Sequence, residues 1–447
     1  MNKFDVQKHI DEAKFGKFHW LILIVCSMLM IFDGYDLFIF GVVLPVVMNE
    51  WGLTPVQAGA LGSYSLFGMM FGALLLGMLA DKIGRKRGII VAFVVFSVAT
   101  FLNGFATNTT EFGLARFFAG LGCGGLMPNA VALINELAPR RMRNTLVTLM
   151  FSGFSLGGVF AAGLGIYLMP KFGWNIMFFA GAAPLLLLPF IIYYLPESLG
   201  FLIRKGRHEE ARKMLKEIQP DSQTVDPSAE LVVIERKTVA KGSVLDLFTE
   251  GRLIGTLAFW VAFFCCLLMV YALGSWLPKL MNNAGYSLGS SLSFLLALNF
   301  GGAAGAILGG WLGDRYNLGK IIIVFFIASV ASISLMGFNS PMPVLYALIT
   351  TAGATVIGTQ ILIYAAVAQF YGLAYRSTGL GWASAVGRTG AIVGPILGGF
   401  LLAMQMPLQA NFIAFAIPGA VAALAMIIFV MVGNPRAENF YGLPGEA

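Results

Sequence analysis

Two aspartates, Asp33 and Asp36, interrupt the apolar stretch MIFDGYDLFIFGVVLP. An ionised carboxylate at the centre of a bilayer costs about 2.5 kcal/mol or more, so each aspartate needs a proton, a partner or water there. Residues three apart lie on one face of a helix, where two carboxylates can titrate as a coupled pair. This behaviour suits a proton carrier. The alternative is that one aspartate caps a helix broken at Gly34 while the other pairs with an arginine.

Two arginines also lie in apolar, glycine-rich stretches, Arg116 in LARFFAGLGCGGLMPNA and Arg388 in GWASAVGRTGAIVGP. A guanidinium stays charged in proteins and can hold a carboxylate through two parallel hydrogen bonds. Arg116 and Arg388 therefore indicate either an anionic substrate or ion pairs inside the protein. We predict that they bind substrate, and that Asn299, Tyr364 and Trp382 form a pocket wall on which a flat ring stacks.

Charged residues recur where apolar stretches end. The segment GMLADKIGRKRG carries an Asp and several basic residues, and GGWLGDRYNLGK repeats the Asp in the second half of the chain. Charge pairs at helix ends can lock one conformation and release it in another. Basic residues alone can be mere topology signals, but that interpretation leaves the repeated aspartate unexplained. We predict a gating role for Asp81, Arg85, Arg87, Glu136, Arg143, Asp314, Arg315 and Arg376.

The composition indicates which elements position these side chains. Of 447 residues, 58% are hydrophobic and only 11% are charged, about half the charged share of a soluble domain. A helix needs about 20 mostly apolar residues to cross the hydrocarbon layer. We therefore predict an all-α integral membrane protein with about twelve spans, near residues 18–47, 56–80, 88–106, 110–136, 144–168, 174–195, 252–280, 287–313, 320–338, 341–370, 376–404 and 408–433.

Basic residues and one polar break predict the topology. Lys and Arg concentrate in alternate loops, which indicates that these loops and both termini face the cytoplasm. No removed signal peptide is expected. The break suggests a first six-helix half at 1–195, a cytoplasmic linker at 196–251, a second half at 252–433 and a cytoplasmic tail at 434–447. Within the linker, residues 209–218 read as a short amphipathic helix, either at the membrane surface or as a solvated linker helix.

The two halves are related in sequence. A constant offset of 233 residues places Gly68, Gly72 and Asp81 on Gly301, Gly305 and Asp314. The same offset places Arg143, Gly157 and Gly165 on Arg376, Gly390 and Gly398. One offset that serves two distant segments predicts two pseudo-symmetric six-helix halves, arranged for alternating access at their interface.

Several other classes of function find little support. The net charge is +7, but the basic residues lie in short loops between apolar runs. This position indicates that they set the membrane topology rather than bind nucleic acid. The string GLGCGG lacks the strand and the Lys-Ser or Lys-Thr of a phosphate-binding loop. The four cysteines of the chain do not have the spacing of metal ligands. We expect no enzyme activity and no cofactor, with the proton as coupling ion.

At this point the chain resembles the major facilitator superfamily over nearly its whole length. The resemblance rests on the motif from Asp81 to Arg87, its weaker echo at Asp314 and Arg315, the Arg116 segment, and PESLGFLIRKGRHEEARKML. Within the superfamily, DGYDLFIFGVVLP and the segment from Arg376 to Arg388 are similar to those of the aromatic acid:proton symporters.

This resemblance implies proton-coupled uptake of a small aromatic carboxylate, such as benzoate or hydroxybenzoate, by a monomer in the plasma (inner) membrane. Two alternatives remain open. The first is a carrier for another organic acid or a sugar, because the PES motif and Glu136-Leu137-Ala138-Pro139 also resemble sugar porters. The second is a proton-driven exporter, which shares the fold and much of the gating motif.

Overall fold

The computed structural model describes residues 3–219, 230–232, 244–249, 251–338, 340–371 and 375–432. In these residues, 12 helical segments are long and apolar enough to cross a membrane. The predicted all-α membrane architecture is therefore confirmed. The bounds are α2 (Lys17–Trp51), α3 (Pro55–Ile83), α4 (Arg85–Asn103), α5 (Thr109–Leu137), α6 (Arg143–Phe172), α7 to α8 (Asn175–Tyr194), α11 (Leu253–Asn283), α12 (Leu288–Arg315), α13 (Leu318–Leu335), α14 (Met342–Phe370), α15 (Arg376–Ala403) and α16 (Leu408–Val432).

Local signals set several helix ends. Thr54 accepts a hydrogen bond from the Gln57 backbone N–H, and the Gln57 side chain accepts one from the Thr54 N–H, which closes a capping box before α3. The helix before it ends at Gly52, whose φ of 60° favours glycine. The sixth span is not one regular helix, because the 3₁₀ turn η1 (Ala183–Leu187) separates α7 (Asn175–Ala182) from α8 (Leu188–Tyr194). Pro184 and Pro189 lie at the starts of η1 and α8, where a missing N–H is tolerated.

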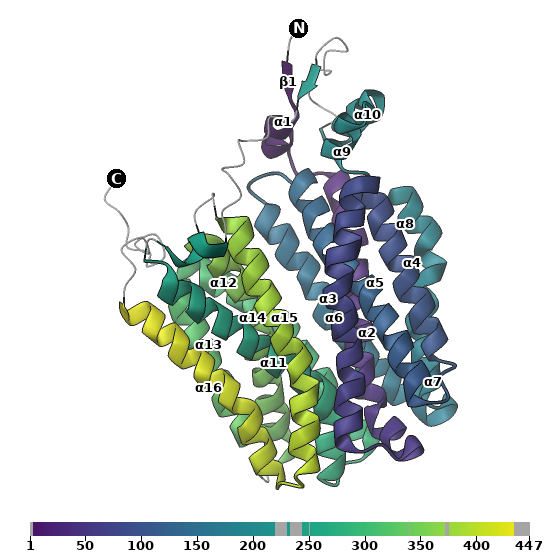
Figure 1. The fold of residues 1–447 in the computed structure, drawn as a ribbon, viewed down its shortest axis with the longest axis vertical. Coiled ribbons are helices and arrows are strands. Elements are labelled where there is room, and N and C mark those ends of the chain that lie inside the picture. Colours follow the sequence, from purple (N-terminus) through teal and green to yellow (C-terminus); the bar gives the residue numbers. More distant parts are fainter. Residues whose placement is uncertain are drawn as a thin grey trace.

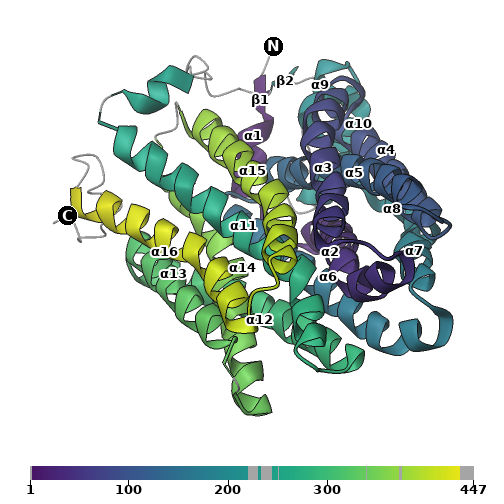
Figure 2. The ribbon, with the colours of Figure 1, turned by 60° about the horizontal axis from the view of Figure 1, so that its bottom comes forward.

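The helices form two bundles that lie side by side (Figures 1 and 2). The first bundle holds α2 to α8 and the second holds α11 to α16. Contacts between the bundles run mainly from α3 to α15, from α6 to α12 and from α2 to α11. The offset of 233 residues relates α3 to α12 and α6 to α15, so the first two contacts are equivalent to one another. The chain thus has the pseudo-two-fold arrangement that the repeat predicts.

Glycines let the helix backbones meet at equivalent places in the two bundles. A Cβ on Gly68 would collide with the carbonyl oxygen of Phe117, and a Cβ on Gly301 would collide with that of Thr350. These two contacts are related by the offset of 233. Gly41 meets its own equivalent, Gly274, across the two halves. Small residues at such crossings permit the close packing on which membrane helices depend.

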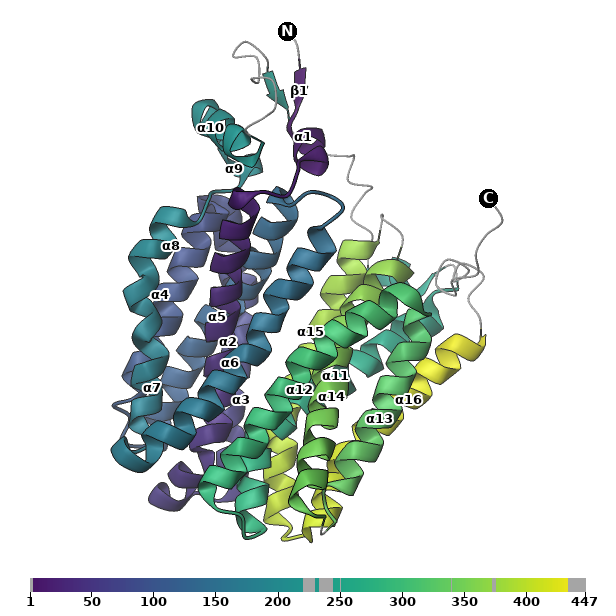
Figure 3. The same cartoon turned by 180° about the vertical axis from the view of Figure 1, so that it is seen from behind.

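The two bundles lie closest near one end and diverge toward the other (Figures 1 and 3). At the close end, the Ser63 hydroxyl donates a hydrogen bond of 2.8 Å to the carbonyl of Ile392. Gly59 lies against the backbone of Pro395 there. The other end, which we call the linker end, carries α1 (Val6–Glu12), α9 (Leu199–Arg204) and α10 (His208–Ile218).

The linker end also holds a two-stranded parallel sheet. Strand β1 (Lys3–Asp5) pairs with β2 (Glu230–Val232), which joins the start of the chain to the segment between the halves. The 3₁₀ turn η2 (Val244–Phe248) follows β2. The predicted helix at 209–218 is confirmed as α10. Its apolar residues Ala211, Leu215 and Ile218 are buried against protein, with contacts to α9 and α2, rather than left for a membrane surface or solvent.

Replacing Gly68 by alanine should separate α3 from α5. The added methyl group would collide with backbone, which cannot move away as a side chain can, and overpacking of this kind costs about 1–3 kcal/mol. We expect the purified Gly68→Ala protein to unfold several degrees below wild type in a thermal scan. Gly77→Ala is the matched control, because a Cβ at Gly77 meets no atom of the described residues within 4 Å. Equal thermal stability of the two variants would contradict the close-contact argument.

Candidate substrate-binding cavity

A cavity lies between the two bundles, with residues of both halves in its wall. It comprises about 730 Å³ of space free of protein atoms, and part of this space is open to solvent. Helices α2, α3, α5 and α6 contribute from the first half, and α11, α14 and α15 contribute from the second. A site shared by the halves can be exposed to either side in turn when the halves move.

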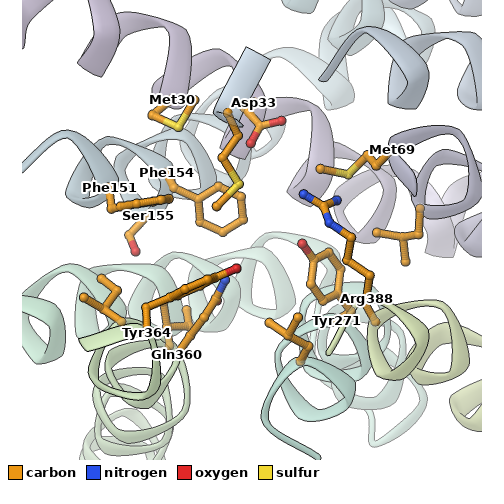
Figure 4. Close-up of a pocket in the computed structure, with 16 residues that line it drawn as sticks. Met30, Asp33, Met69, Phe151, Phe154, Ser155, Tyr271, Gln360, Tyr364 and Arg388 are labelled. Carbon is orange, nitrogen blue, oxygen red and sulfur yellow. The ribbon is translucent and has the colours of Figure 1, made fainter. Parts of the chain in front are cut away.

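Arg388 supplies a positive charge to this cavity. It comes from the middle of α15, is partly buried, and has no hydrogen-bond or ion-pair partner among the described residues. Figure 4 shows its guanidinium directed into the cavity beside the hydroxyl end of Tyr271 on α11. Tyr271 is 9% exposed. An unpaired guanidinium next to a phenol is suited to bind a carboxylate.

Asp33 supplies the opposite charge from α2. Its side chain is 2% exposed, and its Oδ1 atom has no hydrogen-bond partner among the described residues. The carboxylate and the Arg388 guanidinium face the same cavity (Figure 4), yet they are not within the 4.0 Å of an ion pair. A buried carboxylate that has no ion-pair partner among the described residues is costly to keep ionised.

Aromatic rings form the opposite wall. Tyr364 on α14 stacks with Phe151 on α6 at a centroid distance of 6.4 Å and an interplanar angle of 16°. The Tyr364 hydroxyl lies 3.1 Å from that of Ser384, which fixes the ring. Phe154 adds a further ring from α6. Methionines line the rest of the first-half side, and their flexible thioethers adapt to a bound ring.

Two of the predicted pocket residues do not line this cavity. Asn299 is fully buried on α12, where its amide donates to the Leu295 carbonyl and its side chain packs against Gly158 of α6. Trp382 is 43% exposed and stacks on Trp260 at 6.0 Å. Asn299 thus lies at the interface of the halves, and Trp382 lies beside Trp260 of α11. The prediction that they form the pocket wall is wrong in this conformation, whereas Tyr364 does line the cavity.

Comparison with known proteins identifies the family. The family model described as Major Facilitator Superfamily matches residues 26–371 and 290–446. The chain belongs to the major facilitator superfamily. It is similar to the "Benzoate transport protein" of Acinetobacter baylyi, with 45% identity over 97% of this chain and 94% of the relative. It is also similar to the "4-hydroxybenzoate transporter PcaK" of the same species, with 37% identity over 98% and 96%, and to the "Gentisate transporter" of Corynebacterium glutamicum, with 37% identity over 90% and 85%.

Solved structures agree on the fold. The partially occluded inward-open conformation of the xylose transporter XylE from E. coli matches with a TM-score of 0.73 at 16% identity, over 94% of this chain and 99% of that one. The chain is therefore a multi-pass membrane transporter of the superfamily and not an enzyme. The resemblance seen in the sequence is confirmed.

Arg116 lies inside the first bundle of this transporter rather than in the cavity. It forms an ion pair of 2.9 Å with Asp36, and each side chain is only 2% exposed. The Thr100 hydroxyl donates a hydrogen bond of 3.2 Å to the same carboxylate oxygen. The alternative of an internal ion pair thus holds for Arg116, and its predicted contact with substrate is not seen. Asp33 and Asp36, although neighbours on α2, face different surroundings.

Three of the predicted gating residues of the first half, Asp81, Arg85 and Glu136, meet at the linker end. Arg85 forms an ion pair of 3.0 Å with Asp81, lies 3.6 Å from Glu136, and donates a hydrogen bond of 2.9 Å to Asn129. Arg87 is exposed. The Arg85 side chain thus joins the α3–α4 junction to α5. A junction tied by charges of this kind can be released as a unit.

Arg143 makes a different contact. It forms an ion pair of 2.7 Å with Asp11, in the last turn of the N-terminal helix α1, and donates a hydrogen bond to the carbonyl of Ala138. In the second half, Arg315 lies over the Trp311 ring at 4.3 Å. The side chains of Asp314 and Arg376 lie outside the described part of the structure. The gating prediction for these residues stays a prediction.

Sequence reasoning missed several cavity residues, among them Phe151, Phe154 and Ser155. The internal repeat holds a signal for Ser155. Ser155 is the equivalent of Arg388 under the offset of 233, and both residues line the cavity. A residue that is equivalent to a predicted site residue under the offset of 233 is therefore itself a candidate for lining the cavity.

The Asp36–Arg116 pair predicts a strong coupling in stability. Removing one partner leaves a buried charge uncompensated and costs about 3–5 kcal/mol. We expect Asp36→Leu and Arg116→Met each to lower the Tm of the purified protein markedly, and the double variant to lower it by less than the two effects combined. A double variant whose loss equals the combined single losses would show that the pair is not an energetic unit.

Proposed function

We propose that this transporter takes up a small aromatic carboxylate, such as benzoate or a hydroxybenzoate, together with protons. The observation that carries the proposal is the guanidinium of Arg388, which has no hydrogen-bond or ion-pair partner among the described residues and lies in a cavity between the halves that is walled by aromatic rings. The charge suits a carboxylate and the rings suit a flat apolar body. The names of the relatives, which specify aromatic acids, support the same substrate class.

The cavity offers a consistent mode of binding. The carboxylate pairs with Arg388, and the Tyr271 hydroxyl donates a further hydrogen bond to it. The ring extends toward Tyr364 and Phe151, whose planes are nearly parallel. Because Arg388 belongs to the second half and Phe151 to the first, the bound acid touches both halves. Its binding energy is therefore available to draw them together.

Asp33 is the proposed proton carrier. Its buried carboxylate faces the same cavity as Arg388, so a proton there and an anion on Arg388 together leave the cavity neutral. Closing the halves removes water from the cavity, which disfavours any remaining net charge. Coupling then follows because the halves close readily only when both cargoes are bound. Asp36 contributes by holding Arg116 and the local structure of α2 and α5.

The charge clusters at the linker end suggest how the halves alternate. In this state Arg85 binds Asp81 and Glu136 within one half. We propose that these contacts exchange for contacts with the second half when the linker end closes, with Asp314, Arg315 and Arg376 as the equivalent set. The concentration of basic residues in the loops at this end supports a cytoplasmic orientation. The chain would then lie in the plasma (inner) membrane as a monomer, with both termini in the cytoplasm and no cofactor.

Proton coupling is testable with vesicles that hold the purified protein. Radiolabelled benzoate should accumulate when an inward proton gradient is imposed and should leave when an uncoupler collapses it. In Asp33→Asn, accumulation should be abolished while exchange of labelled for unlabelled substrate persists, because exchange needs no net proton movement. Glu209→Gln neutralises an exposed carboxylate on α10 and is the matched control. Undiminished gradient-driven accumulation in Asp33→Asn would remove Asp33 from the mechanism.

The role of Arg388 predicts that charge alone is insufficient. Lysine at this position keeps the charge but loses the planar pair of donors, so we expect Arg388→Lys to bind benzoate about tenfold more weakly. Isothermal titration of the detergent-solubilised protein measures this change. Wild-type affinity in Arg388→Lys would exclude a bidentate contact to the carboxylate.

A further inference from the structure

Ser155 and Gln360 present polar groups to the cavity that the described protein atoms leave without a partner. The Ser155 side chain on α6 is 2% exposed, and its hydroxyl makes no hydrogen bond to the described residues. The neighbouring Ser152, by contrast, donates to the Leu149 carbonyl. The Gln360 amide on α14 likewise has no partner there. Polar groups in such places are normally satisfied, so a buried hydroxyl and an amide directed into a cavity point to a ligand.

These groups lie on the aromatic side of the cavity. Ser155 stands one helical turn after Phe151, and Gln360 stands one turn before Tyr364, so each shares a helix face with one ring of the stacked pair. Figure 4 shows Ser155 and Gln360 on one side of the cavity and the Arg388 guanidinium on the other. A flat molecule whose carboxylate is bound to Arg388 therefore directs the far edge of its ring toward Ser155 and Gln360.

The pseudo-two-fold arrangement supports this placement. Ser155 and Arg388 occupy equivalent positions, 233 residues apart, on the equivalent helices α6 and α15. Equivalent positions on the two halves face the interface from opposite sides. The cavity is thus polar at both ends, with a fixed charge at one end and neutral donors and acceptors at the other.

We propose that Ser155 and Gln360 recognise hydroxyl groups at the meta and para positions of the aromatic acid, so that the transporter prefers such hydroxybenzoates to benzoate. This rests on the proposed function. A serine hydroxyl and a glutamine amide can each donate and accept, which matches a phenolic hydroxyl that does both. An unsubstituted ring leaves these groups without a protein or ligand partner, and a site built to bind a hydroxyl rejects analogues that lack it. An ortho hydroxyl lies beside the carboxylate, at the Arg388 end, and gains nothing from Ser155 or Gln360.

The experiment measures the Kd of four acids for the purified full-length protein: benzoate and its 2-, 3- and 4-hydroxy derivatives. Two hydrogen bonds of ordinary strength change an affinity by about tenfold or more. We expect at least one of 3- and 4-hydroxybenzoate to bind about tenfold more tightly than benzoate, and 2-hydroxybenzoate to show no such gain. Equal Kd values for benzoate, 3-hydroxybenzoate and 4-hydroxybenzoate would overturn the proposal.

Two variants assign the preference to the named residues. In Ser155→Ala and in Gln360→Leu, the ratio of the benzoate Kd to the hydroxybenzoate Kd should fall toward one. The ratio is taken within one preparation, so a loss of folded protein does not affect it. Ser152→Ala removes a hydroxyl from the same helix outside the cavity and should keep the wild-type ratio. A ratio that survives in both cavity variants would overturn the proposal, whereas failure of the wild-type protein to bind any of the four acids would instead refute the proposed function.

Discussion

A charge inside an apolar bundle must be paired or kept in contact with water, and this constraint determines where the ionisable residues of this transporter lie. Arg116 and Asp36 meet it by pairing deep in the first bundle, where each is 2% exposed. Arg388 and Asp33 meet it differently, since both face a cavity that is partly open to solvent. The first pair fixes structure because neither charge can leave the other. Under the proposed mechanism, Arg388 and Asp33 stay available for an anion and a proton.

Close backbone contacts hold each half together and also join the two halves. Gly68 meets Phe117 and Gly301 meets Thr350, so each half is bound tightly within itself at equivalent crossings. The halves can therefore move as units. Between them, Gly41 meets its equivalent Gly274 near the pseudo-two-fold axis, where displacement is smallest when the halves rock. Rigid halves and a close contact between them are the physical conditions for alternating access.

The sequence predicts this fold well because hydropathy and the internal repeat are signals of the whole chain. It predicts the cavity only in part. Asp33, Arg388 and Tyr364 were found because a charge or a polar ring stands out in an apolar span, whereas Asn299 and Trp382 met the same criterion and lie elsewhere. A helix that is apolar on every side carries no periodic signal of which face meets lipid, a neighbouring helix or the cavity. The break in the sixth span escaped prediction for a related reason, since proline is compatible with an intramembrane helix.

The two residues to which the proposed mechanism assigns the proton and the anion lie at positions where the two halves differ. Asp33 corresponds to Cys266 under the repeat, and Arg388 corresponds to Ser155. The carboxyl group of Asp33 therefore belongs to the first half only, and the guanidinium of Arg388 belongs to the second half only. Under the proposed mechanism, this division explains both the loaded step and the empty return step of the transport cycle. With acid anion and proton bound, the cavity is neutral and the halves can close over it. With neither bound, Asp33 and Arg388 can neutralise one another directly as the halves approach, which lets the empty transporter return. An anion bound without a proton leaves Asp33 charged and opposes closure, so transport of the acid alone is suppressed by the same two residues.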